Sequence, residues 1–296
     1  MSQLRMSCSC GSLVLNDGRS IPSVGLGVYQ SEPGSETYDA VAEALRLGYR
    51  HVDTAAFYDN EADVGQAVRD SGVDRDAIWV TSKLWPYQYD GRTATAAYEF
   101  ALSEAENSLE LLGIEYIDMY LIHAPPERSS KYDVRAAMWR AMEEVQRRGW
   151  CRSIGVSNYG EHHLTALIDS PETTVVPAVN QIEIHPFLRR DALAAKCAVL
   201  GIAVQAYSPL AKARRLTDER LVSLALKRGM SSAQLMLRWA LQRGYIVLPK
   251  SVTPSRIAEN LRAATAGEWE LSDADMAELG RLDEHLVTGW DPTVQA

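Results

Sequence analysis

The chain has 296 residues, of which 46% are hydrophobic and 23% charged, and its formal net charge is −9. This is ordinary globular composition, and the negative charge argues against nucleic acid or an anionic membrane as a general partner. No apolar run reaches the roughly 18 residues of a membrane span, and the first fifteen residues lack the apolar core of a signal peptide. We therefore expect a soluble, cytoplasmic protein.

Four cysteines in a chain of this length do not form a disulfide framework. Cys8 and Cys10 are too close for an easy mutual bridge, and Cys151 and Cys197 are interpreted as small core residues. A cluster at 161–163, Glu-His-His, is a poor metal site because adjacent helical positions point about 100° apart. The sequence therefore predicts no metal.

The elements begin with a hairpin in "LVLNDGRSIP", which turns at Asn16-Asp17-Gly18. Strands and helices then follow one another, and Asn60 is expected to cap the second helix. The expected strands are 24–30, 51–53, 78–83, 116–123, 152–158, 178–184, 202–208 and 245–251. The expected helices are 36–48, 60–72, 93–112, 134–148, 162–168, 191–200, 218–227, 231–242, 254–263 and a last one from 272.

Eight alternating strand–helix units predict an α/β fold with parallel strands, closed as a (β/α)₈ TIM barrel. A doubly wound sheet that bound a dinucleotide would carry G-x-G-x-x-G after its first strand, but residues 25–30 read Gly-Leu-Gly-Val-Tyr-Gln. No linker interrupts the series. We predict one domain over residues 1–296, with an N-terminal hairpin, a flexible N-terminus at 1–10 and a short C-terminal tail.

The predicted strands end in polar groups, and the ends of barrel strands are where active sites lie. These residues are Asp53, Lys83, His123, Asn158, Gln181, Tyr207 and Lys250. Any one of them alone would be interpreted as a solvated strand end. Seven such residues at one rim of the barrel predict an active site there.

Four of the residues in this region form a coherent acid catalyst. A phenol such as Tyr58, with a pKa near 10, is a poor proton donor to a carbonyl oxygen at neutral pH. We expect the Lys83 ammonium to lower the pKa of Tyr58 and Asp53 to keep Lys83 charged. His123 can donate to and orient the same substrate oxygen.

The other rim residues favour a ligand that is aromatic at one end and anionic at the other. Asn158 and Gln181 carry amides that can donate to and accept from a carboxamide, and Tyr207 offers a flat face for stacking. Lys250, Ser251 and Arg256 surround the start of a helix, which suits a terminal phosphate. Arg256 alone would be interpreted as a solvated helix residue.

The series "VDTAAFYDNE", "TSKLW", "LIHAP", "GVSN", "NQIEIHP", "AYSPL" and "PKSVTPSRIAEN" closely resembles the aldo-keto reductase family. The similarity runs from about residue 11 to about residue 280, and it implies a (β/α)₈ barrel that binds NADPH without a Rossmann motif. It places the family's catalytic tetrad on Asp53, Tyr58, Lys83 and His123. Its cofactor contacts fall on Ser157, Asn158, Gln181, Tyr207, Ser208, Leu210, Lys250, Ser251, Val252, Thr253, Arg256, Glu259 and Asn260.

Departures from the family pattern concern the substrate. Ala124 follows the catalytic histidine where many members have tryptophan, which should widen the pocket, and Tyr29 replaces a tryptophan after the first strand. Trp85 is an expected pocket wall, and Trp290 is either another wall or a packed tail residue. The compact form is similar to microbial and protozoan carbonyl reductases, including diketogluconate reductases and protozoan prostaglandin F synthases.

The resulting hypothesis is an NADPH-dependent reductase of aldehyde and ketone carbonyls, of the alcohol dehydrogenase (NADP+) type, with Tyr58 as proton donor. We expect a monomer with a small-molecule carbonyl substrate. The alternatives are an NADPH-binding sensor with little turnover and a specialised prostaglandin F synthase. A barrel hydrolase would need a nucleophile–base pair or a metal cluster at the strand ends, and neither is visible in the sequence.

Overall fold

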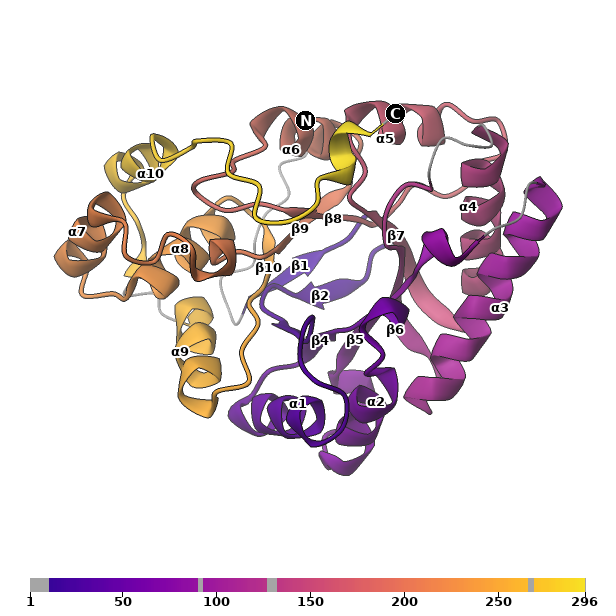
Figure 1. Cartoon of the computed structure of the whole chain (residues 1–296), viewed down its shortest axis with the longest axis horizontal. Helices are drawn as coiled ribbons and strands as arrows, with labels where there is room; N and C mark the ends of the chain where they lie inside the picture. Colours follow the sequence, from indigo (N-terminus) through magenta and orange to yellow (C-terminus); the bar gives the residue numbers. More distant parts are fainter. Residues whose placement is uncertain (1–10, 90–92, 127–131, 266–268, 296) are drawn as a thin grey trace.

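The computed structural model describes residues 11–89, 93–126, 132–265 and 269–295. Within these residues, parallel strands form a central barrel that the helices surround (Figure 1). The strands are β1 Ser12–Val14, β2 Ser20–Pro22, β3 Leu26–Gly27, β4 His51–Asp53, β5 Trp79–Leu84, β6 Ile117–Ile122, β7 Cys151–Ser157, β8 Val179–Glu183, β9 Ala203–Tyr207 and β10 Ile246–Leu248. The helices are α1 Ser35–Leu47, α2 Glu61–Asp70, α3 Ala94–Leu112, α4 Tyr132–Arg147, α5 Glu161–Ile168, α6 Asp191–Val199, α7 Glu219–Lys227, α8 Ser232–Gln242, α9 Pro254–Thr265 and α10 Asp273–Gly280.

The eight strands β3 to β10 pair in chain order, and every neighbouring pair is parallel. The two ends of this sheet meet at parallel bridges between Val24 and Val247 and between Gly27 and Lys250. The Gly25 amide donates to the Val247 carbonyl at 2.9 Å across the same seam. The prediction of a (β/α)₈ barrel is therefore confirmed.

Apolar side chains on the outer face of the strands pack against the helices. Val52, Val80 and Ile154 from the strands share one buried cluster with helix residues such as Ala44 and Leu45. Burial of such surface stabilises a protein by about 25 cal/mol per Å². This core holds the strands in place, so the residues at their ends have fixed positions.

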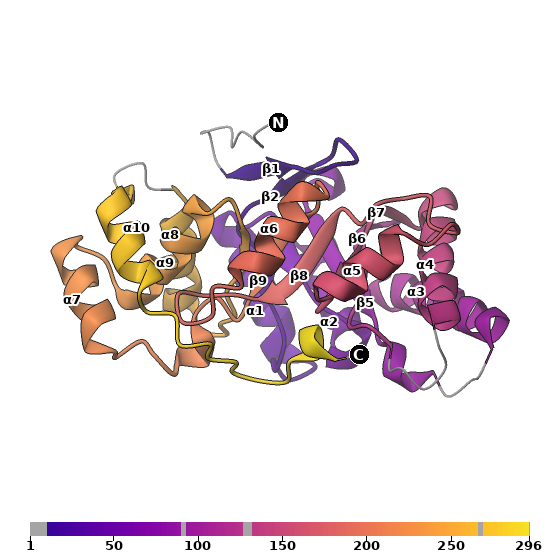
Figure 2. The same cartoon turned by 90° about the horizontal axis from the view of Figure 1, so that it is seen from above.

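The predicted hairpin is present as β1 and β2, paired antiparallel in register from Ser12–Pro22 to Val14–Ser20. Leu13, Leu15 and Ile21 form a second buried cluster with Met119, Val179 and other residues near the beginnings of the barrel strands. Figure 2 shows the hairpin at one end of the barrel and the C-terminal segment at the other. The hairpin closes the end from which the strands start, so a ligand enters at the opposite end.

Strands and helices do not alternate strictly after β9, because two helices, α7 and α8, separate β9 from β10. Each begins at its own capping residue: the Asp218 side chain accepts from the amides of Arg220 and Leu221, and Ser231 accepts from Gln234. Side-chain caps of this kind satisfy amides that a helix start leaves free, so α7 and α8 are separate helices.

Asn60 occupies the N-cap position of α2, but the expectation that its side chain caps the helix is wrong, since that side chain makes no capping hydrogen bond. Its oxygen accepts from the Thr54 hydroxyl at 2.7 Å, and its nitrogen donates to the carbonyls of Val28 and Ser31. The amide is buried, and these partners satisfy its hydrogen-bonding groups. Asn60 therefore joins the loop after β4 to the loop after β3.

Cys151 and Cys197 are buried and unbridged, as the sequence predicted. The expectations for residues 1–10, including Cys8 and Cys10, lie outside the described residues. Across the described helices, none is long and apolar enough to cross a membrane. No group of three or more His, Cys, Asp or Glu in the described part of the chain is placed to hold a metal ion.

Candidate active site

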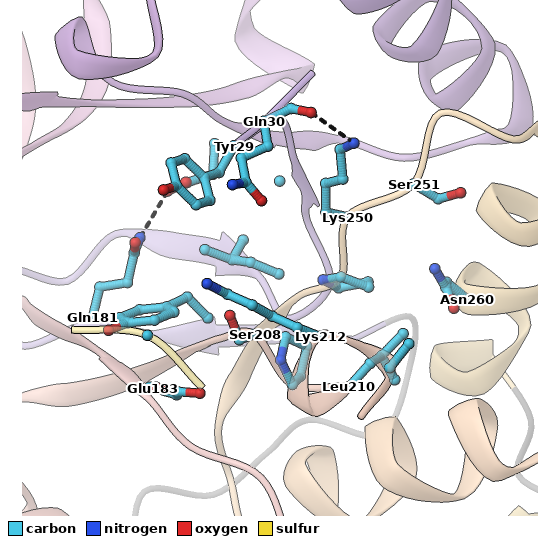
Figure 3. A pocket seen from close by; sticks show the side chains of 18 of the residues that line it. Tyr29, Gln30, Gln181, Glu183, Ser208, Leu210, Lys212, Lys250, Ser251 and Asn260 are labelled. Atoms are coloured by element: carbon cyan, nitrogen blue, oxygen red, sulfur yellow. Dashed lines mark hydrogen bonds between the residues drawn. The ribbon is translucent and has the colours of Figure 1, made fainter. Parts of the chain in front are cut away.

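A cavity of about 760 Å³ opens where the barrel strands end. Most of the residues predicted for the site line it: Tyr29, Asp53, Tyr58, Trp85, His123, Ser157, Asn158, Gln181, Tyr207, Ser208, Leu210, Lys250, Ser251, Val252, Thr253, Arg256, Glu259, Asn260 and Trp290. Figure 3 shows part of this lining, with Gln30 and Lys250 on one wall and Ser208 and Leu210 on the other. Two predicted residues do not line it, Lys83 and Ala124.

Lys83 lies behind the cavity wall, fully buried, with its ammonium in contact with three oxygens. The Nζ atom is 2.6 Å from Asp53 Oδ1, 2.8 Å from the Thr54 carbonyl oxygen and 3.2 Å from Tyr58 Oη. An ammonium has three N–H donors and no acceptor, so all three are used and the contact to Tyr58 runs from lysine to phenol. The Tyr58 hydroxyl proton must therefore point away from Lys83.

Local structure explains how these groups meet. Asp53 is the last residue of β4 and is paired in register with Thr81 of β5. Lys83 follows two residues later on β5 and so points to the same face of the strand as Thr81, toward the barrel interior. A short 3₁₀ turn, Ala56–Tyr58, then brings Tyr58 back over this ion pair.

The ion pair between Lys83 and Asp53 is almost completely buried, and burial disfavours both charges. Burial lowers the pKa of Lys83, while the neighbouring Asp53 opposes this shift. Burial likewise raises the pKa of Asp53, against the effects of Lys83 and of the Gln181 amide, which donates to Asp53 Oδ2 at 2.7 Å. Each charge therefore opposes the effect of burial on the other.

The expectation that Lys83 lowers the pKa of Tyr58 is wrong. Burial raises the pKa of Tyr58 well above its usual value, and the negative charge of Asp53 raises it further. The positive charge of Lys83 is already paired with Asp53, whose own charge acts on Tyr58 in the opposite direction. Tyr58 is therefore un-ionised at neutral pH and carries a proton that it can donate.

His123 follows β6, and its ring meets the Tyr58 ring edge-on with the two centroids 5.5 Å apart. Burial, with a contribution from Lys83, lowers the pKa of His123 well below its usual value, so the imidazole is neutral. The Asn158 amide donates to the backbone carbonyl of His123 at 2.9 Å and fixes the loop that carries it. A neutral imidazole retains one N–H that can donate to a ligand oxygen.

The two amides expected to hold a carboxamide are partly used by the protein itself. Both N–H groups of Asn158 donate, to His123 and Ser157, and both of Gln181 donate, to Asp53 and Gln205. They can therefore offer a ligand only their oxygens, which corrects the expectation that they both donate and accept. The Tyr207 hydroxyl donates to Asn158 Oδ1 at 2.8 Å, which fixes the Tyr207 ring beside them.

The opposite end of the cavity is more exposed and carries cationic side chains. Lys250 is exposed, and its ammonium donates to the Gln30 carbonyl at 3.0 Å (Figure 3). The Ser251 hydroxyl accepts from the Thr253 amide at 3.1 Å just before α9 begins. Arg256 in the first turn of α9 lines the same wall. A helix start beside two cations is a favourable setting for a phosphate.

Aromatic side chains surround the mouth above Tyr58 and His123. The Phe57 and Trp85 rings are stacked with centroids 4.2 Å apart, and Trp290 meets Trp85 edge-on at 6.2 Å. Trp290 is 45% exposed and lines the cavity, so it is a wall rather than a packed tail residue. Ala124 is fully buried and does not line the cavity, which corrects the expectation that it shapes the pocket.

Several lining residues were not predicted from the sequence, including Gln30, Phe57, Glu183 and Lys212. Glu183 could have been found, because it lies two residues after Gln181 on β8 and therefore faces the same side of the strand. Lys212 lies on the loop after β9, with its ammonium 5.8 Å from the centroid of the Tyr29 ring. No periodic pattern marks a loop residue of this kind, so the sequence offered no signal for it.

Known proteins are similar to this chain in both sequence and fold. The profile of the Aldo/keto reductase family matches residues 23–284. An aldo-keto reductase of Mycolicibacterium smegmatis is 43% identical over 95% of this chain and 96% of its own length. The 9,11-endoperoxide prostaglandin H2 reductase of Trypanosoma cruzi is 38% identical over 97% of this chain and 96% of its own length.

A solved structure gives the same result in three dimensions. The aldo-keto reductase of Bombyx mori, determined in complex with NADP, superimposes with a TM-score of 0.84. It is 32% identical and covers 95% of each chain. The closed barrel, the site at its strand ends and these similarities lead to one conclusion: the chain belongs to the aldo/keto reductase family, whose members are oxidoreductases that act on carbonyl compounds.

Proposed function

We propose that this protein reduces aldehyde and ketone carbonyls to alcohols with NADPH and that Tyr58 is the proton donor. The observation that carries the proposal is the arrangement around Lys83. All three of its N–H groups are used, and one of them is donated to Tyr58. The phenolic proton is thus directed away from Lys83, and Tyr58 lines the cavity. A carbonyl oxygen in the cavity can accept that proton.

The residues present fit a nicotinamide cofactor with an additional phosphate. The oxygens of Asn158 and Gln181 can accept from a carboxamide, and the Tyr207 ring offers a stacking face beside them. Lys250 and Arg256 supply positive charge at the other end of the cavity. When bound, NADPH supplies the hydride that adds to the carbonyl carbon.

In this proposal the protein residues supply and control the proton. Tyr58 transfers its proton to the carbonyl oxygen while that oxygen gains negative charge. Lys83 donates to the Tyr58 oxygen and so stabilises the phenolate as it forms, rather than lowering the pKa of the resting phenol. Asp53 keeps Lys83 charged, and neutral His123 can donate a second hydrogen bond to the substrate oxygen.

The function is tested by a panel of carbonyls that includes sugars, aromatic aldehydes, methylglyoxal and prostaglandin endoperoxide. NADPH consumption and alcohol formation are measured for each compound. Alcohol formed in equal amount to the NADPH consumed would support the reductase. Tight NADPH binding without consumption on any member of the panel would overturn it in favour of the sensor. Preferred turnover of the endoperoxide would favour the prostaglandin F synthase.

The choice of NADPH over NADH is tested at Lys250. A charge-assisted hydrogen bond to phosphate contributes about 1.5–3 kcal/mol, so Lys250→Met should weaken NADPH binding about 10- to 100-fold. NADH, which lacks the additional phosphate, should bind the variant and the wild type equally. Equal losses for both cofactors would show that Lys250 does not contact that phosphate. We also propose a monomeric, cytoplasmic, single-domain protein, for which sedimentation measures the oligomeric state.

A further inference from the structure

The C-terminal segment from Thr288 to Thr293 is held on both sides of Trp290. This segment runs from α10 toward α5 in Figures 1 and 2. Thr288 is 3% exposed and Thr293 is 6% exposed, whereas Trp290 between them is 45% exposed. The last residues of a chain are usually poorly ordered, because fixing their backbone costs conformational entropy. An exposed tryptophan there keeps a defined position only if contacts on either side of it hold the backbone.

The first anchor is Glu183, the last residue of β8. The Thr288 amide donates to both carboxylate oxygens, at 3.0 and 3.2 Å, and the Thr288 hydroxyl donates to Oε1 as well. Glu183 is 1% exposed, and His185 Nε2 lies 3.4 Å from the same oxygen. Burial opposes ionisation, but the hydrogen bonds from His185 and Thr288 prevail and lower the pKa of Glu183. An ionised carboxylate therefore holds Thr288.

The second anchor is Arg190, on the turn between β8 and α6. Its Nη2 is 2.9 Å from Asp291 Oδ1, and its Nη1 donates to the Thr293 hydroxyl at 2.9 Å. Its Nε donates to the backbone carbonyl of Glu183 at 3.1 Å, so both anchors are connected. The tail also passes so close to Gly160 that an added Cβ would lie 2.0 Å from the Thr293 carbonyl oxygen.

We propose that Glu183 and Arg190 are positioning residues that fix Trp290 as a rigid wall of the substrate mouth. Trp290 meets the rings of Trp85 and Tyr87 edge-on, at 6.2 and 5.4 Å. With the backbone held at Thr288 and Asp291, a substrate gains ring contacts without ordering the tail itself. The consequence, which rests on the proposed function, is selectivity for bulky aromatic carbonyls over small aliphatic ones, for which the wall is out of reach.

The proposal is tested with Arg190→Met and Thr288→Val. Arg190→Met removes the guanidinium but keeps a long apolar stem, and Thr288→Val removes only the hydroxyl. The matched controls are Arg189→Met, at the neighbouring position, where the arginine contacts Gly280 and Asp191 rather than the tail, and Thr288→Ser, which keeps the hydroxyl. Hydrogen exchange at the amides of residues 288–291 and 293 reports on the anchors, and KM and kcat are measured with 2-naphthaldehyde and with propanal.

Loss of an anchor should speed exchange of these amides about tenfold or more in both test variants and leave both controls unchanged. KM for 2-naphthaldehyde should rise about three- to tenfold, the size of a typical aromatic pair, with KM for propanal and the Kd for NADPH within about twofold of the wild type. Unchanged exchange, or equal KM increases for both aldehydes, would overturn the proposal.

Failure of this proposal can be distinguished from failure of the proposed reductase function. If the wild type reduced neither aldehyde, the reductase proposal would fail, but the exchange measurement would still decide whether Glu183 and Arg190 hold the tail. If Arg190→Met failed to fold, Thr288→Val would provide the same comparison, because it removes one hydroxyl and leaves the charges in place.

Discussion

Short ion pairs with buried carboxylates lie at both ends of the barrel in the described part of the chain. Lys83 and Asp53 are 2.6 Å apart at the cavity end, and Arg75 and Asp118 are 2.6 Å apart near the beginnings of the strands. In both pairs burial raises the pKa of the carboxyl group and the partner cation opposes the shift. Distance and burial alone would therefore assign the two pairs the same role.

The surroundings separate them. Asp118 also accepts from the Val80 amide at 3.0 Å, and Arg75 also donates to the Ile78 carbonyl. Neither Arg75 nor Asp118 lines the cavity. Lys83 instead contacts Tyr58, which faces a cavity and has a proton to donate. Arginine does not change its protonation state in proteins, whereas the pKa of a buried lysine shifts readily. An ion pair indicates catalysis only when its next neighbour can exchange a proton with a ligand.

The largest difference between the two ends of the barrel is expected for substitutions at Tyr58. Tyr58→Phe removes the proposed proton donor while keeping the ring, so kcat should fall about 100- to 10,000-fold, the usual contribution of general acid catalysis. The Kd for NADPH, measured by fluorescence quenching, should stay within about twofold. Tyr116→Phe, at the opposite end of the barrel, is the matched control and should leave kcat unchanged. A Tyr58→Phe enzyme that kept most of its turnover would remove the distinction between the two ends.

The next largest effect is expected when the cation of each ion pair is removed. Lys83→Met leaves Asp53 buried without its counter-ion, so the free energy of unfolding should fall by about 3–5 kcal/mol and turnover should be lost. Arg75→Met should cost less stability, because Arg75 is more exposed and Arg152 also approaches Asp118, at 3.6 Å. Its kcat per folded molecule should equal that of the wild type.

Urea unfolding and active-site titration measure both quantities. The double variant Asp53→Asn with Lys83→Met should recover stability but not turnover, since both buried charges are gone. If Arg75→Met lost turnover to the same extent as Lys83→Met, the two pairs would not differ in function.

His51, inside the barrel between the two ends, provides a pH test. Its ring contacts the Pro22 carbonyl, Thr81 and Gln205, and burial lowers the pKa of His51 to about 4. A group with a depressed pKa in the folded state stabilises the protein above its unfolded pKa, near 6.5. That contribution is lost as the pH falls through about 4. The free energy of unfolding should therefore decrease by about 3 kcal/mol over this window from His51 alone.

The measurement is urea unfolding at a series of pH values between 7 and 4. His51→Gln keeps hydrogen-bonding capacity but has no proton to gain, so its curve should be flatter by that amount. Identical slopes for the variant and the wild type would show that His51 does not titrate in this window.

The smallest effect is expected at Tyr116. The guanidinium groups of Arg75 and Arg152 lie over its ring, 4.1 and 3.7 Å from the centroid. Cation–π contacts at partly exposed sites contribute about 0.5–1 kcal/mol each, so Tyr116→Leu should lower the free energy of unfolding by about 1–2 kcal/mol. Turnover should be unaffected, because these contacts lie near the beginnings of the strands, at the end of the barrel opposite the cavity. Thermal unfolding and a kinetic assay together test both statements.

The sequence was sufficient for the barrel and for most of the site, because both follow from local patterns. Apolar runs ended by polar residues predict buried strands whose ends meet at one rim, and Asp53, His123 and Asn158 lie at such ends. The contacts that place Trp290 through Glu183 depend instead on residues far apart in the chain. Glu183 holds Thr288 from 105 positions away, and no local pattern connects them.

The pKa of Tyr58 could not be predicted from the sequence. Residue types alone favoured a lysine that acidifies a tyrosine, whereas the folded protein raises the pKa of Tyr58 because burial outweighs a cation already paired with Asp53. Likewise, Ala124 lies outside the cavity wall although it is next to His123 in the chain.

Periodicity and strand ends are short-range properties, and they predict the element order, the closed barrel and the residue types at its rim. Which hydrogen-bond donors remain free, which charges cancel and where the tail lies follow only from the folded arrangement. These properties depend on distances between segments far apart in the chain, and on the water that their packing excludes.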